Sequence, residues 1–183
     1  MIISASRRTD IPCYYTEWFF NRLKDGSVLV PNPRNANRLG RVELSPEHVD
    51  CIVFWTKNPA PMLERLPLID EMGYPYYFEF TVTAYGREIE RNVPEKSAVI
   101  DIFKRLSDKI GPGRVDWRFD PILINERLSA SWIAEQYEIL CGQLHEYTER
   151  CIISFVDEYS HTRNRNFLLN RNDMLETARH IAA

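Results

Sequence analysis

Short apolar runs alternate along this chain with longer segments whose apolar residues recur every three or four positions. The continuous apolar run 51–55 is typical of a strand covered on both sides, and the largely apolar segment 151–156 also predicts a strand. Segments 14–24 and 99–110 carry an apolar stripe at helical spacing. The pattern gives about six strand-then-helix units, the order typical of parallel α/β sheets with right-handed crossovers. The predicted strands are 2–4, 28–30, 51–55, 76–83, 115–119 and 151–156.

The segments between the strands predict a loop and short helices. Residues 31–40, PNPRNANRLG, are rich in turn formers and predict a loop. Ser45 followed by Pro46 predicts the start of a short helix, because proline suits the first helical position. Pro67 should divide the helical segment after residue 58 into two short pieces.

Two of the predicted strands carry polar residues on one face. In 115–120 the odd positions are apolar and the even positions charged, and 76–83 alternates in a similar way. A doubly wound sheet covers both faces with helices and favours apolar residues on both, so we expect the polar faces to line a solvated interior. The sequence therefore predicts a partial or complete (βα) TIM-type barrel of about six units with a polar lumen. We expect a single domain over residues 1–183.

Composition narrows the functional classes. The net charge of −3 over 183 residues gives no global attraction to nucleic acid or anionic membranes, so any basic site must be local. The start of the chain is unlike a signal peptide and no apolar run is long enough to span a membrane, so we expect a cytoplasmic protein. The four cysteines and four histidines lack metal-site spacing, so no metal site is expected. The cysteines are Cys13, Cys51, Cys141 and Cys151.

Charged residues follow most of the predicted strands. The stretch SASRRTDIP, residues 4–12, comes directly after the first strand and places two arginines beside an aspartate. Ligands bind at the carboxyl ends of parallel strands, and arginine forks suit phosphate or carboxylate oxygens. The residues assigned to ligand binding are Arg7, Arg8, Arg34, Lys57, Arg118 and Tyr85. Those assigned to orienting the arginines or transferring protons are Asp10, Glu79 and Asp120, the alternative being ion pairs that tie loops to the rim.

Several motifs together resemble the bacterial domain-of-unknown-function 1848 family. They are SASRRTDIP, VLVPNP, VDCIVFWTKNPAPML, YYFEFTVTAYG, FKRLSDKIGP, WRFDPILI and CIISFVDEY. The resemblance implies kinship with radical S-adenosylmethionine enzymes and spore-photoproduct-lyase-like proteins, in which longer relatives carry a cysteine-rich C-terminal segment for an iron–sulfur cluster. No such cysteine group is present here, so we expect either a truncated chain or a short member, with no cofactor evident in it.

These observations favour an enzyme, or its substrate-binding part, that acts on a small phosphorylated or nucleotide-like anion. One alternative is a fragment of a radical enzyme of nucleic-acid repair, although the net charge does not favour nucleic acid. Another is a non-catalytic domain that docks an iron–sulfur partner.

Overall fold

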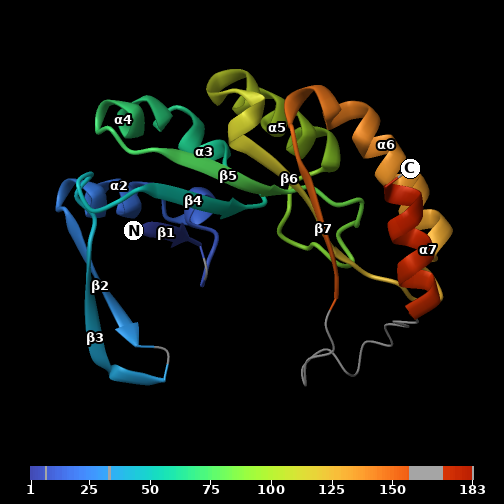
Figure 1. Ribbon diagram of the computed structural model, residues 1–183, viewed down its shortest axis with the longest axis horizontal. Coiled ribbons are helices and arrows are strands. Elements are labelled where there is room, and N and C mark those ends of the chain that lie inside the picture. Colours follow the sequence, from blue (N-terminus) through green and yellow to red (C-terminus); the bar gives the residue numbers. More distant parts are fainter. Residues whose placement is uncertain (7, 33, 157–170, 183) are drawn as a thin grey trace. The chain divides into compact units, whose positions relative to one another are not determined.

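The computed structural model describes residues 1–6, 8–32, 34–156 and 171–182, and the chain forms two compact units, Met1–Phe80 and Thr81–Ala183. Five strands form one sheet in the order β1-β4-β5-β6-β7, and β2 and β3 form a separate antiparallel pair (Figure 1). The strands are β1 (Ile2–Ala5), β2 (Ser27–Asn32), β3 (Asn35–Glu43), β4 (Cys51–Thr56), β5 (Tyr76–Thr81), β6 (Val115–Ile122) and β7 (Cys151–Phe155).

The prediction of a TIM-type barrel with a polar lumen is wrong, because the parallel strands form an open sheet flanked by helices. The predicted strand at 28–30 does form, as part of β2, but it lies outside the parallel sheet and pairs with β3. Within the described part of the chain, five parallel strands therefore remain in place of six, and they do not close on themselves. The alternation of residue types was consistent with a closed lumen, but the polar face of an open sheet gives the same pattern.

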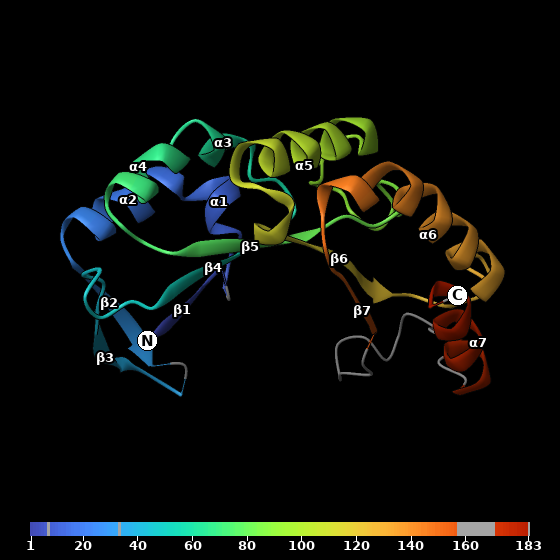
Figure 2. The ribbon, with the colours of Figure 1, turned by 45° about the horizontal axis from the view of Figure 1, so that its top comes forward.

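In the first unit, helices cover one face of β1, β4 and β5 (Figure 2). Aromatic rings fill the space between the layers: Phe54 stacks on Phe78 at 4.9 Å, and Phe19 meets Phe54 edge-on at 5.4 Å. Burying each ring stabilises the unit by about 2–3 kcal/mol. The helices are α1 (Ile11–Tyr14), α2 (Thr16–Lys24), α3 (Ala60–Leu63) and α4 (Leu66–Glu71), so the segment around Pro67 is divided as expected.

The second unit is built on β6 and β7, which run parallel with Trp117 opposite Cys151. The Trp117 ring stacks on Tyr137 of α6 at 5.2 Å, and its Nε1 donates a 2.9 Å hydrogen bond to the Val82 carbonyl. The helices are α5 (Lys96–Ile110), α6 (Ala130–Leu144) and α7 (Arg171–Ile181), with single 3-10 turns η1 (Pro112–Arg114) and η2 (His145–Tyr147). None of the described helices is long and apolar enough to cross a membrane.

The segment between β1 and β4 departs from the expectation in two places. The loop predicted at 31–40 is largely strand, because β2 and β3 pair from Ser27 opposite Glu43 out to Asn32 opposite Asn35. The helix predicted at Ser45 is a turn, closed by a 2.9 Å bond from the His48 amide to the Ser45 carbonyl. The antiparallel pair of β2 and β3, called the β2–β3 ribbon below, extends away from β1 and β4 in Figure 1.

Candidate functional site

The Asp10 carboxylate joins the loop after β1 to the loop after β4. Its Oδ1 accepts hydrogen bonds from the Cys13 amide at 2.9 Å and the Thr56 hydroxyl at 2.8 Å. Its Oδ2 accepts from the Lys57 amide at 2.8 Å. Asp10 is also the N-cap of α1, a position at which an aspartate satisfies an otherwise unpaired amide. One carboxylate therefore fixes two neighbouring strand ends and a helix start.

Burial raises the pKa of the Asp10 carboxyl above its ordinary value, against the opposing effect of hydrogen bonds from Lys57, Cys13 and Thr56. Nearby, Ser6 has a φ of +87°, a backbone conformation that costs energy for a residue with a side chain. Its hydroxyl accepts a 3.1 Å bond from the Ile11 amide. These contacts hold the two loops together, whereas the sequence assigned Asp10 to orienting the arginines or transferring protons, and that assignment stays a prediction.

Two predicted cations lie in the loops that Asp10 joins. Arg8 is exposed, and its Nη2 donates a 2.8 Å bond to the Pro31 carbonyl at the end of β2. Lys57 is half-buried and directly follows β4. Arg7 lies outside the described residues.

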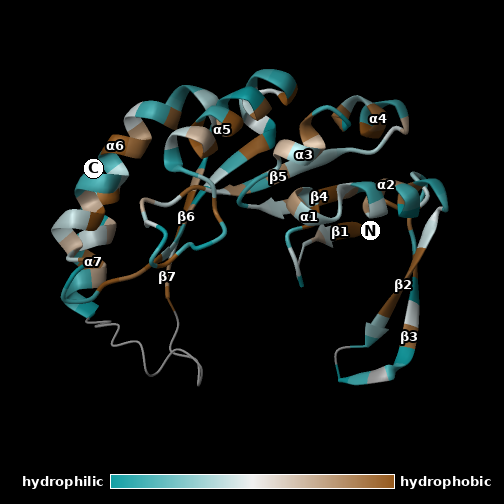
Figure 3. Cartoon of the chain, turned by 180° about the vertical axis from the view of Figure 1, so that it is seen from behind, coloured by the Kyte–Doolittle hydropathy of each residue, from teal (hydrophilic) through white to brown (hydrophobic). Residues whose placement is uncertain are grey.

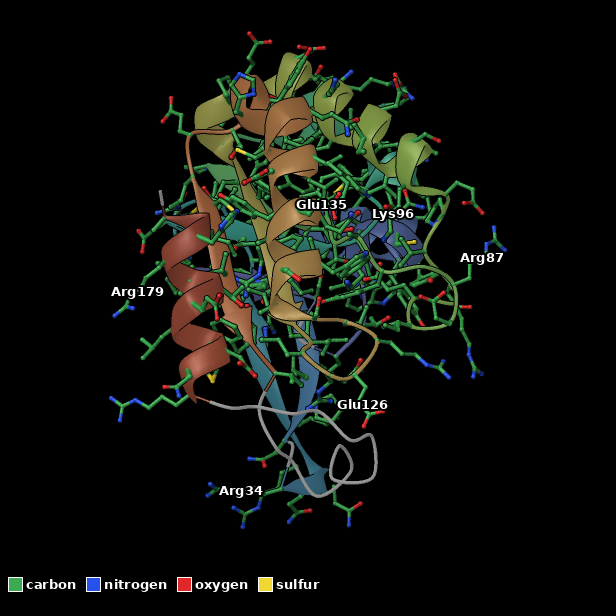
Figure 4. The ribbon with its side chains drawn as sticks, turned by 90° about the vertical axis from the view of Figure 1, so that its right-hand side faces the viewer. Arg34, Arg87, Lys96, Glu126, Glu135 and Arg179 are labelled. Carbon is green, nitrogen blue, oxygen red and sulfur yellow. The ribbon has the colours of Figure 1, made fainter. Side chains whose placement is uncertain are left out.

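The other two predicted residues of the first unit lie elsewhere in it. Arg34 lies at the tip of the ribbon (Figure 4), where its amide donates to the Asn32 side chain at 2.8 Å. Glu79 is buried within β5, in register with Trp55. The structure thus joins Asp10 to the Lys57 backbone and the Arg8 side chain to Pro31 of β2, and it places Arg34 at the tip of the β2–β3 pair.

In the second unit, Arg118 and Asp120 bind one another. The Arg118 Nε donates to Asp120 Oδ1 at 3.0 Å and its Nη2 donates to Oδ2, so the pair is bidentate. Both side chains are 14% exposed, and the Ser154 hydroxyl adds a 3.3 Å bond to Asp120. A bidentate carboxylate holds the guanidinium plane in one orientation and offsets its charge. Asp120 therefore orients Arg118 in this structure.

Tyr85, predicted to bind ligand, is only 3% exposed. Its hydroxyl donates to the Pro121 carbonyl and accepts from the Leu123 amide, both at 2.9 Å. Desolvation raises the pKa of this phenol above its ordinary value. The Tyr85 hydroxyl thus holds the end of β6 and the residue that follows it through two hydrogen bonds.

Thr56 and Arg150 have roles that the sequence analysis did not assign. Thr56 is buried and donates a hydrogen bond to Asp10, 46 positions away in the sequence. Its position directly after the apolar run 51–55 is the feature of the sequence that could have assigned it to this site. Arg150 pairs in a bidentate manner with the buried Asp116. Asp116 lies among the charged even positions of β6, but its partner is 34 residues away and no local pattern identifies it.

The described residues do not fit an iron–sulfur cluster or another metal centre. No group of three or more histidine, cysteine or carboxylate side chains that could hold a metal ion occurs among them. The cysteines are free and divided between the units, with Cys13 and Cys51 in the first and Cys141 and Cys151 in the second. Desolvation raises the pKa of the Cys151 thiol to about 12, which keeps it protonated at neutral pH.

A shallow cavity of about 210 Å³ lies between α6 and α7. Its walls carry three glutamates, and His180 bonds to one of them, Glu138, at 2.7 Å. This charge disfavours an anion there, so the cavity does not suit the ligand class that the sequence predicts. The lining residues are Ala130, Ser131, Ala134, Glu135, Glu138, Glu176, Thr177 and His180.

Comparison with known proteins identifies the family. Residues 2–182 match the domain of unknown function DUF1848, so the chain belongs to that family. No curated protein and no solved structure matches the chain. The family resemblance of the sequence motifs is confirmed, while the kinship with radical S-adenosylmethionine enzymes stays a prediction.

Proposed function

We propose that this DUF1848 domain binds a small phosphorylated or nucleotide-like anion at the strand ends of its first unit, with Arg8 and Lys57 as the primary contacts. The observation that carries the proposal is the Asp10 bridge, which accepts from Thr56 and from the Lys57 amide. It holds two loops side by side, and each of them supplies a cation. The carboxyl ends of parallel strands are the usual ligand-binding edge of such sheets.

The two cations contribute in different ways. Arg8 is exposed and uses Nη2 to contact Pro31, which leaves further N–H groups of its fork to meet two oxygens of a phosphate. Lys57 has its backbone amide fixed by Asp10, so its side chain extends from a defined point and supplies a compact positive charge. Asp10 itself is occupied by hydrogen-bond donors, and we assign it the positioning of both loops rather than proton transfer.

Two further parts of the proposal are separate from one another, Arg118 with Asp120 in the second unit and Glu79 in the first. Arg118 is held flat by Asp120 and is 14% exposed, so it suits orienting a ligand through hydrogen bonds more than attracting it through charge. Glu79 is buried on β5 and is the candidate base. Variants at these positions separate their contribution from that of Arg8 and Lys57.

Thermal-shift and calorimetric titrations test the proposal, with inorganic phosphate, nucleoside phosphates, sugar phosphates and dicarboxylates as ligands. We expect phosphorylated compounds to raise the melting temperature in proportion to the logarithm of their concentration, and salt to weaken the effect. Arg8→Ala and Lys57→Ala should each reduce affinity about tenfold, the equivalent of about 1.4 kcal/mol.

Lys24→Ala is the matched control, because Lys24 is an exposed cation of the same unit at the end of α2. It removes the same charge and should leave the affinity unchanged. The proposal fails if none of the anions stabilises the protein, or if Lys24→Ala weakens binding as much as Lys57→Ala does.

A further inference from the structure

The β2–β3 ribbon is a two-stranded arm whose strands pair with one another and with no other described strand. It leaves large apolar side chains in solvent, with Leu29 61% and Leu39 59% exposed. Hydrophobic and hydrophilic residues lie side by side along it (Figure 3). An isolated hairpin with open edges is marginally stable and prone to pairing, so its length and exposure call for a functional explanation.

The arm is basic in an acidic chain. Residues 27–43 hold three arginines and one glutamate, a net charge of +2, while the whole chain carries −3. Arg41 bonds to Glu43 at 2.8 Å, but both side chains are largely exposed, so that pair is weak and screened by salt. Among the described residues, neither Arg34 nor Arg38 forms an ion pair.

The arginines point to both sides of the ribbon. Arg41 stands opposite Leu29, and Leu39 stands opposite Pro31, so these four residues share one face. Arg38 lies one position before Leu39 and therefore projects from the other face. Arg34 lies at the tip (Figure 4). A flat partner surface would meet only one of these faces, whereas the walls of a groove meet both.

We propose that the β2–β3 ribbon is an arm that enters the major groove of duplex DNA. The major groove of B-DNA admits a two-stranded ribbon, and phosphates border it on both sides. Arg38 would face one wall, and Arg41 would face the other together with Leu29 and Leu39, which share its side of the ribbon. The role goes beyond the small-anion site proposed above and does not depend on it.

Fluorescence polarisation with a labelled 20-base-pair DNA duplex, at 50 to 200 mM salt, tests the arm. Three arginine–phosphate contacts predict that the logarithm of affinity falls with the logarithm of salt at a slope of about −2.7. The triple variant Arg34→Ala, Arg38→Ala, Arg41→Ala should lose at least tenfold in affinity at 50 mM salt and most of that slope. A single strand of the same sequence should bind more weakly than the duplex.

The matched control is the triple variant Arg87→Ala, Arg91→Ala, Arg105→Ala, which removes three exposed arginines from the second unit. It should keep the duplex affinity within about threefold, since only a general charge effect would lower it. The proposal is overturned if the protein does not bind the duplex, or if both triple variants lose the same duplex affinity. It is also overturned if the single strand binds more tightly than the duplex.

Two further measurements distinguish DNA binding by the ribbon from self-association and from the small-anion site. Sedimentation of the wild type and of a Leu29→Ser, Leu39→Ser variant should show the same monomeric mass, and a wild-type dimer that this variant dissociates would instead make the ribbon a self-association arm. The ribbon triple variant should keep its affinity for inorganic phosphate, while Arg8→Ala should lower that affinity about tenfold. A failure of either proposal is thus visible without the other.

Discussion

The Asp10 carboxylate and the Thr56 hydroxyl meet across 46 positions of sequence, at 2.8 Å from Oδ1 and 2.9 Å from Oδ2. Thr56 in turn accepts a 3.0 Å bond from the Asn58 amide. The bonds at Asp10 and Thr56 thus fix the loop after β4 to the loop after β1. The geometry of the candidate anion site depends on this bridge.

Replacing Asp10 by alanine should lower the free energy of unfolding by about 2–3 kcal/mol, because it removes a helix N-cap and leaves the Thr56 hydroxyl buried without its partner. Urea denaturation measures the loss. Asp25→Ala is the control, since Asp25 is exposed at the end of α2 and should cost under about 0.5 kcal/mol. Equal losses in the two variants would contradict a structural bridge.

The burial of Asp10 should also make the free energy of unfolding depend on pH. Burial raises its folded-state pKa above the ordinary value of 3.8, so the folded protein holds more protons than the unfolded chain between these two values. The contribution of this group to stability should therefore fall as the pH rises from about 3.8 through the folded pKa, and stay constant above it. Unfolding free energies of wild type and Asp10→Asn between pH 3 and 7 test this, because the variant should lack that part of the slope.

Tyr85→Phe should destabilise the protein by about 1–3 kcal/mol, because it leaves the buried Leu123 amide without an acceptor. Tyr15→Phe, at a tyrosine that is 48% exposed, should change stability by less than about 0.5 kcal/mol. Chemical denaturation compares the two. A Tyr85→Phe variant that keeps full stability but loses ligand binding would restore the ligand-contact role predicted from sequence.

Arg150→Ala should lower the free energy of unfolding by about 1–2 kcal/mol, because the Asp116 carboxylate, 7% exposed, loses two hydrogen bonds, while the 63% exposure of Arg150 limits the effect. Adding Asp116→Asn should recover part of that loss, since the buried charge is then removed. Arg105→Ala is the control, because its pair with Asp101 is long, at 3.9 Å, and exposed. Thermal and urea unfolding measure the loss of stability in each variant. An equal loss in Arg150→Ala and Arg105→Ala would contradict a stabilising role for the Arg150–Asp116 pair.

Cys151 should react slowly with maleimide in the folded protein at pH 8. Burial raises the pKa of this thiol from 9.0 to about 12, so the thiolate is roughly a thousandfold scarcer than in the unfolded chain. Peptide mapping by mass spectrometry measures labelling at each cysteine, and in guanidinium chloride all four should react alike. Equally rapid labelling of Cys151 in the folded state would show that the thiol is neither buried nor protonated.

The local elements follow from short stretches of the amino-acid sequence. Apolar periodicity places α2, α5, α6 and the strands of the parallel sheet, and the odd-even alternation in 115–120 gives the buried and polar faces of β6. Such patterns follow from backbone geometry and from burial of one face, both of which operate within a few residues. The motifs behind the family resemblance are local in the same sense.

The way these elements assemble depends on contacts between distant parts of the chain. A polar strand face has the same alternation in a barrel and in an open sheet, so the pattern could not decide closure. The pairing of β2 with β3 depended on a partner strand whose asparagines and glycine read as a loop. The contacts of Asp10 with Thr56 and of Asp116 with Arg150 join residues 46 and 34 positions apart. Such pairings depend on how the chain brings distant loops together, and no short segment encodes that.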